Sequence, residues 1–233
     1  MSQVAGLFNS SLARKYWMAL TGLFLCLFLV GHLAGNLQLL LPLEDGAKDQ
    51  FNLYAKFMTT NPVVKILSYL TYISILLHVV DGIVLTIRNR KARPQKYAYN
   101  KPGANSAWNS RFMGFLGTVI LVFIVLHLNA FWAKMHWGPI DTYMIDGEEV
   151  KDLYTLTIAS FQDASAGLGM TIVYVISMIV LGFHLVHGFQ SAFRSMGWNH
   201  PKYMPIVMTV GKLFGIIIPA LFALIPIYIH FIL

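Results

Sequence analysis

The feature of the sequence that most limits its fold is a set of five long apolar runs. They cover residues 16–41, 62–87, 108–133, 164–193 and 208–233. An α-helix rises about 1.5 Å per residue, so crossing about 30 Å of hydrocarbon takes roughly 20 apolar residues. Lipid offers no partners to backbone polar groups, and the runs are too long and too continuously apolar for barrel strands. We therefore expect an all-α membrane protein with five transmembrane helices, in a single domain over residues 1–233.

The composition agrees with this expectation. Hydrophobic residues make up 57% of the chain and charged residues only 12%, a balance typical of multi-span membrane proteins. The first run follows Arg14 and Lys15, but it is too long for a signal peptide and no small-residue cleavage pattern follows it. The single cysteine, Cys26, excludes an internal disulfide, and we interpret it as a packing residue.

The charged residues divide unevenly between the two sets of helix ends. Twelve of the basic residues flank one set and five flank the other, whereas nine of the ten acidic residues lie on the side that is poor in basic residues. This asymmetry predicts a cytoplasmic N-terminus and an external C-terminus, and it accounts for the net charge of +7 without nucleic-acid binding. The basic loop 88–111 is interpreted either as a topology determinant or as a docking surface for a soluble partner. Of the outer loops, 42–61 is expected to contain a short amphipathic helix, and 135–163 is a long acidic loop.

Five of the eight histidines lie within the apolar runs. They are His32, His78, His127, His184 and His187. Ionisable side chains within a membrane are costly and rare, so each is a candidate functional residue. One neutral histidine that hydrogen-bonds across helices would need no further role, but one on each of four helices is hard to explain in that way.

The depth of these histidines suggests how they pair. Four of them lie about ten residues, or about 15 Å of helix rise, before the C-terminal end of their own runs: His32, His78, His127 and His184. Because successive helices alternate in direction, His32 and His127 are expected in the outer half of the bilayer, and His78 and His184 in the inner half. Two imidazoles at one depth are what bis-histidine ligation of a b-type haem requires, so the sequence predicts two haem sites in a bundle formed by the first four helices. His187 competes with His184, which we prefer because both His78 and His184 have a glycine four residues on.

Small residues follow each candidate ligand by three or four positions. They are Gly35, Gly82, Ala130 and Gly188. A low helix wall at these places would admit a flat macrocycle. Asp81, one turn from His78, is the only acidic residue deep in a run. We expect it to hydrogen-bond a backbone or histidine neighbour, or to take part in proton transfer.

The sequence resembles a known family at these residues. Five helices, the segment TGLFLCLFLVGHL that contains His32, and the H-x-x-x-G pattern at His78 and His184 are similar to the dihaem cytochrome b membrane anchor of succinate dehydrogenase and fumarate reductase complexes. The resemblance covers nearly the whole chain. It implies an outer haem on His32 and His127 and an inner haem on His78 and His184, the same pairs that the spacing predicts.

The resemblance also implies partners and a location. A flavoprotein subunit and an iron-sulfur subunit would lie on the cytoplasmic face of a bacterial inner membrane, and electrons would pass through the two haems to or from a quinone, usually menaquinone. This chain has no cysteine set for iron-sulfur clusters and no dinucleotide fingerprint, so no succinate site is expected in it.

Two other interpretations remain open at this point. The first is a dihaem cytochrome b anchor of another respiratory complex, such as a hydrogenase, formate dehydrogenase or nitrate reductase. The second is a cofactor-free transporter or proton channel, for which broken helices and buried acids would be typical, with Pro219 and Pro226 as the candidate break points.

Overall fold

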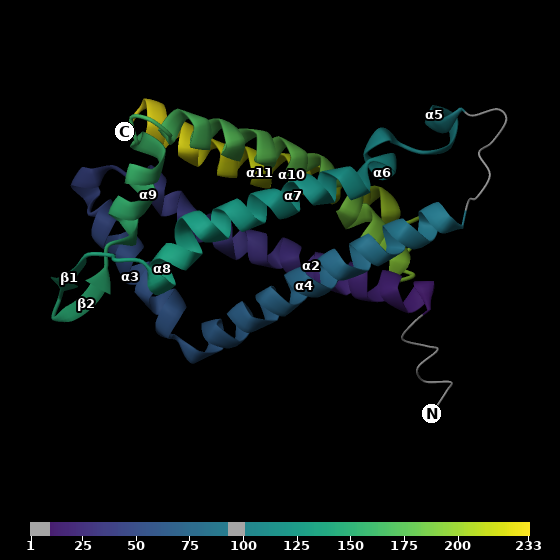
Figure 1. Ribbon diagram of the computed structural model, residues 1–233. Coiled ribbons are helices and arrows are strands. Elements are labelled where there is room, and N and C mark those ends of the chain that lie inside the picture. The colour runs from purple at the N-terminus through teal and green to yellow at the C-terminus, as the bar shows by residue number, and fades with distance from the viewer. Residues whose placement is uncertain (1–9, 93–100) are drawn as a thin grey trace.

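Five long helices form the body of the protein, and a small cap covers one end of it (Figure 1). The computed structural model describes residues 10–92 and 101–233. Five helical stretches are long and apolar enough to cross a membrane: Ser11–Leu40, Pro62–Lys91, Met113–Trp137, Gly167–Ser195 and Met204–Phe231. The chain is therefore an all-α, multi-pass membrane protein, as the apolar runs predict.

The helix ends differ from the predicted ones by a few residues because local capping decides them. Helix α2 (Ser11–Asn36) begins five residues early because the Ser10 side chain accepts a hydrogen bond from the Ala13 amide. Helix α4 (Pro62–Lys91) is capped in the same way by Asn61. Helix α10 (Gly167–Ser195) starts later than expected because the Asp163 carboxylate ties the preceding turn to Ser165.

The third membrane span is irregular. Its predicted start is wrong, because Trp108–Arg111 forms a separate short helix, α6. The span begins with α7 (Met113–His127), continues as a π-helix (Leu128–Ala133) and ends with α8 (Lys134–Trp137). The wider π turn rotates the residues after His127 relative to an unbroken α-helix, and such segments occur frequently at functional sites.

The fifth span, α11 (Met204–Phe231), lies along α10. The two helices approach closely at Gly182 and Gly215, where a Cβ on Gly182 would come within 2.8 Å of the Gly215 carbonyl oxygen. Helix α11 stays helical through Pro219 and Pro226. The break that a transporter would place there is therefore not found.

The cap is formed by the outer loops, and the sequence pattern predicts only one of its elements. It contains two short 3₁₀ turns (Leu37–Leu40 and Leu43–Asp45), helix α3 (Ala47–Thr60), a hairpin of β1 (Thr142–Ile145) and β2 (Glu148–Lys151), and helix α9 (Leu153–Gln162). The predicted helix in loop 42–61 is confirmed as α3. The hairpin pairs Thr142 with Lys151 and is the only sheet in the described residues. Neither the hairpin nor α9 was expected in the acidic loop.

Polar contacts hold the cap together around Asn52, which is 1% exposed. Its amide donates to the Tyr143 hydroxyl (3.0 Å) and to Asp152 (3.2 Å), and its carbonyl accepts from the Tyr154 backbone amide (2.9 Å). Lys48 forms an ion pair with Asp152 at 2.6 Å. Beneath this network, Leu33 and Leu39 pack with Tyr154 and Phe161, so the cap shares one apolar core with the end of α2.

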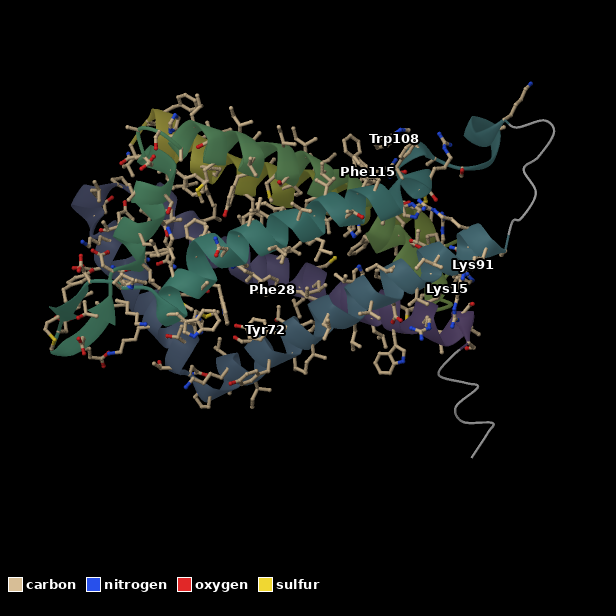
Figure 2. All side chains as sticks on the ribbon, viewed as in Figure 1. Lys15, Phe28, Tyr72, Lys91, Trp108 and Phe115 are labelled. Carbon is tan, nitrogen blue, oxygen red and sulfur yellow. The ribbon has the colours of Figure 1, made fainter. Side chains whose placement is uncertain are left out.

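The two ends of the bundle differ in charge as the sequence predicts. Figure 2 shows Lys15 and Lys91 at the end that also carries Trp108 and the short helix α5 (Pro102–Asn105), opposite the cap. The acidic residues Asp49, Glu148 and Asp152 lie in the cap. Residues 93–100 of the basic loop 88–111, which include Arg93 and Lys96, lie outside the described residues.

Candidate functional site

The four candidate ligands meet as two pairs. The ring centroids of His32 and His127 are 5.9 Å apart, and those of His78 and His184 are 6.2 Å apart. The partners in each pair come from different helices, α2 with α7 and α4 with α10. The structure thus brings together the same two pairs that the spacing predicts, with the His32–His127 pair nearer the cap.

Both distances fit a metal held between two imidazoles. Two metal–imidazole bonds of about 2 Å in line place the ring centroids roughly 6 Å apart. The planes within each pair are inclined by 88° and 68°, respectively. Among the described residues no group of three or more histidine, cysteine, aspartate or glutamate side chains converges, so the histidine pairs suit axial ligation of a macrocycle better than a fully protein-bound metal ion.

The His32–His127 pair lies among aromatic rings. Phe28 stacks on His32 with a centroid distance of 5.2 Å, and Phe222 of α11 lies 5.7 Å from it. Around His127 the ring centroids of Phe123, Phe131 and Tyr174 lie 5.4–5.9 Å away. Helix α11 therefore contributes to this pair, which the expectation of a bundle made from the first four helices does not include.

The hydroxyl of Tyr174 also contacts the imidazole. It lies 3.0 Å from Nδ1 of His127, so that nitrogen of the ring faces α10. His32 has a weaker neighbour, since Asn36 Nδ2 is 3.5 Å from its Nδ1 and donates to the His32 carbonyl at 2.7 Å. Phe131, in the π-helix, reaches both His127 and Tyr174, so the irregular turn helps to close this pair.

The His78–His184 pair lies against glycines instead. A Cβ on Gly22 would be 3.2 Å from Cε1 of His78, and one on Gly117 would be 3.8 Å from Cε1 of His184. Thr21 Oγ1 lies 3.1 Å from Nδ1 of His78. Nδ1 of His184 is buried with no hydrogen-bond partner, which costs about 1–3 kcal/mol unless a partner reaches that nitrogen.

His184 rather than His187 faces His78. The ring contact with His78 is made by His184, and His187 lies one turn further along α10, partly buried. The preference for His184 on the basis of spacing therefore agrees with the geometry.

The glycines that follow the histidines have different surroundings. Around Gly188 a Cβ would meet nothing within 4 Å, which leaves open space on the face that carries His184. Gly82 is in ordinary contact with Met18, whereas Gly35 is covered by the ring of Tyr54 from α3. The low wall predicted at Gly35 is therefore wrong, because the cap fills that position.

Asp81 has a partner that the sequence does not suggest. It forms an ion pair with Arg14 of α2 at 2.6 Å, and a groove of about 280 Å³ lined also by Trp17 and Leu77 lies beside the pair. The expectation of a backbone or histidine partner is wrong, because α2 and α4 pack closely and bring the guanidinium of Arg14 to the carboxylate. Arg14 and Thr21 lie on one face of α2, and both contact α4 near His78.

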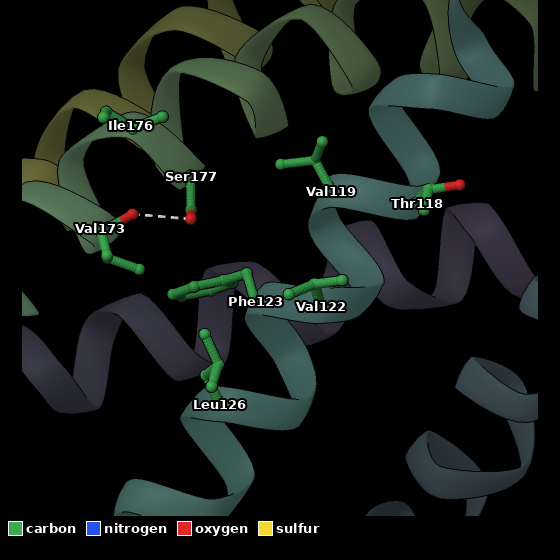
Figure 3. Close-up of a pocket in the computed structure, with 8 residues that line it drawn as sticks. All are labelled: Thr118, Val119, Val122, Phe123, Leu126, Val173, Ile176 and Ser177. Carbon is green, nitrogen blue, oxygen red and sulfur yellow. Dashed lines mark hydrogen bonds between the residues drawn. The ribbon is translucent and has the colours of Figure 1, made fainter.

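An apolar groove lies along α7, lined by residues 118–126 of α7 and by Val173, Ile176 and Ser177 (Figure 3). It has a volume of about 380 Å³, and it lies between α7 and α10. It begins one residue after Gly117, where a Cβ would lie 3.8 Å from Cε1 of His184, and it includes Phe123, whose ring contacts His127. The polar Ser177 in its wall donates to the Val173 carbonyl at 2.7 Å, so the lining presents carbon to the space.

Comparison of the chain with protein-family models, with curated proteins and with solved structures gives no significant match. The arguments for function therefore come from the residues and their geometry, together with the resemblance given above.

Proposed function

We propose that this protein is a dihaem cytochrome b that carries electrons within a membrane. The observation that supports this most is the meeting of four intramembrane histidines as two pairs, with centroid distances of 5.9 and 6.2 Å. A single such pair is explicable as helix packing. Two pairs at two levels, drawn from four different helices, match the arrangement needed to hold two macrocycles in a bundle.

His32 and His127 would hold one b haem, and His78 and His184 the other. A haem iron with two imidazole ligands exchanges one electron reversibly, and its potential depends on its ligands and surroundings. The protein residues supply the rest. Phe28, Phe123 and Phe222 exclude water at one level, while Thr21 and Tyr174 fix the orientation of the imidazoles.

The proposed cellular role is the membrane anchor of a succinate:quinone oxidoreductase in a bacterial cytoplasmic membrane. The resemblance at His32, His78 and His184 supports it, and so does the charge difference between the two ends of the bundle. The basic end, which carries Lys15 and Lys91, would face the cytoplasm and receive an iron-sulfur subunit together with its flavoprotein. Electrons would pass between that partner and a membrane quinone, with menaquinone the expected substrate.

The haem assignment is tested by single histidine substitutions. His78→Ala and His127→Ala should each remove one of two b haems from the purified protein and leave the reduced-minus-oxidised spectrum of the other. His136→Ala and His187→Ala serve as matched controls, because in the described residues neither ring faces a histidine of another helix. Both variants should retain two haems. Equal haem loss in the controls, or full haem in both test variants, would overturn the assignment.

The role in the complex needs a separate test. Purification from native membranes under mild detergent should recover a flavoprotein and an iron-sulfur subunit with succinate:quinone activity. Recovery of a hydrogenase or formate dehydrogenase subunit instead would support the other dihaem interpretation and leave the two haem sites intact. A colourless protein would favour the transporter interpretation.

A further inference from the structure

The hydroxyl of Thr21 is within hydrogen-bond distance of a histidine of one pair and also of a backbone carbonyl of its own helix. Thr21 lies in α2 and is 6% exposed. Its Oγ1 lies 2.7 Å from the Trp17 carbonyl oxygen and 3.1 Å from Nδ1 of His78. A hydroxyl has a single proton to donate and two lone pairs that accept.

The carbonyl of Trp17 can only accept, and it is the shorter contact. The single hydroxyl proton of Thr21 is therefore directed along the helix to Trp17, one turn earlier. Its lone pair then faces Nδ1 of His78, so this nitrogen must be the donor. The carbonyl of Met18, 3.3 Å from Oγ1 of Thr21, can also only accept, so it gives the hydroxyl proton a second acceptor within α2.

We propose that Thr21 is a positioning residue that holds His78 as the tautomer with its proton on Nδ1, leaving the Nε2 lone pair for a metal. This inference rests on the proposed haem function and goes beyond it, because it assigns a role to a residue that is not itself a ligand. Gly22 supports the arrangement, since the absence of a side chain there lets the imidazole lie against α2, with Cε1 3.2 Å from where a Cβ would be.

The opposite ligand has no such partner. Nδ1 of His184 is buried without a hydrogen bond, so the His78–His184 pair is asymmetric. A hydrogen bond accepted from the outer nitrogen of a metal-bound imidazole raises the basicity of the ligand, which favours the oxidised metal. Removal of the Thr21 hydroxyl should therefore raise the midpoint potential of the haem at this pair.

The test compares Thr21→Val, Thr21→Ser and Thr71→Val in the full-length protein. Thr71 is a matched control: it is also 6% exposed and donates to the carbonyl four residues earlier, at 2.9 Å, but contacts no histidine. A redox titration followed by absorbance gives both midpoint potentials in each variant. Thr21→Val should shift one potential upward and leave the other unchanged, whereas Thr21→Ser and Thr71→Val should match the parent protein.

Loss of one haem in Thr21→Val, with that haem retained in Thr21→Ser, would also support the assignment. Unchanged potentials in Thr21→Val, shifts of both potentials, or the same change in Thr71→Val would overturn it. The parent protein distinguishes this failure from failure of the proposed function: if the parent binds no haem, the function is wrong, and if it binds two while Thr21→Val behaves like Thr71→Val, only the role of Thr21 is wrong.

Discussion

The two histidine pairs lie in contrasting surroundings. The His32–His127 pair is enclosed by aromatic rings and covered by the cap, whereas the His78–His184 pair lies against glycines and near an ion pair. At the first pair bulky side chains fill the space around the imidazoles. At the second pair α2 lies close to the His78 ring at Gly22, and the Arg14–Asp81 ion pair joins the same two helices, α2 and α4. The two sites should therefore respond to different substitutions.

The largest expected effect comes from filling the glycine contact at His78. Gly22→Val would place a branched side chain where a single Cβ already lies 3.2 Å from the imidazole. The ring must move, so the protein should lose the haem at His78 and His184 and keep the other, which halves the haem per chain. Gly31→Val is the matched control on the same helix, because a Cβ there meets nothing within 4 Å. Loss of the haem at His32 and His127 in Gly22→Val would contradict the claim that the two pairs respond to different substitutions.

The ion pair between Arg14 and Asp81 gives the next effect. Asp81→Asn removes the charge that is 2.6 Å from the guanidinium and should destabilise the protein by about 1–3 kcal/mol, less than for a fully buried pair because Arg14 is partly exposed. Detergent-unfolding curves measure this loss. The double variant Arg14→Gln with Asp81→Asn should be less destabilised than the sum of the single variants. Strict additivity would mean that the pair does not join α2 to α4.

Tyr174→Phe tests the His32–His127 pair with a smaller change. It removes only the hydroxyl that lies 3.0 Å from Nδ1 of His127 and leaves the ring contacts. We expect an upward shift of the midpoint potential of the haem at His32 and His127 alone, because that ligand loses a hydrogen-bond acceptor. Tyr69→Phe, on the exposed face of α4, should have no effect. A shift at the His78–His184 pair would contradict the separation of the two sites.

The smallest expected effect is a pH dependence of the cap. Burial raises the pKa of Asp152, but the hydrogen bonds from Lys48 and Thr155 outweigh it and hold the pKa below its ordinary value. A carboxylate with a lowered pKa stabilises the fold above its unfolded pKa of about 3.9, and this contribution is lost as the pH falls through the folded value. The loss should be below about 1 kcal/mol, because Lys48 is well exposed.

Lys48→Gln supplies the control for this acid response. Acid unfolding of the cap, followed by hydrogen exchange at Tyr154, should begin at a higher pH in this variant than in the parent protein. The spectrum of the haem at His78 and His184 should not change over the same range. An acid response at that pair first would contradict the view that the cap supports only its own end of the bundle.

The sequence predicts the spans, the helix in loop 42–61 and the histidine pairs because each depends on local hydropathy or on depth along one helix. The histidines pair correctly because the rise per residue is constant and successive helices alternate in direction. The partners of those histidines are different in kind. Thr21 and His78 lie 57 residues apart, and Tyr174 and His127 lie 47 apart. Only the rotation of each helix about its axis determines that they meet.

The other features that the sequence did not predict also depend on how the helices pack against one another. Phe131 in the π-helix contacts Phe161 of α9 and Tyr174 of α10, and no local pattern encodes such contacts. Arg14 has the position of a residue that anchors a helix end, and only the close approach of α2 and α4 makes it the partner of Asp81. Polar residues within apolar runs, such as Thr21, are the signal that sequence reasoning could have used.

We propose that four imidazoles hold two irons, each between two rings. Low-temperature electron paramagnetic resonance of the oxidised, purified chain, together with haem quantification, tests it most directly. Two b haems per chain with low-spin, bis-histidine signals are the predicted result. A protein that binds no haem, or one whose signals persist when His78 and His127 are both replaced by alanine, would contradict it.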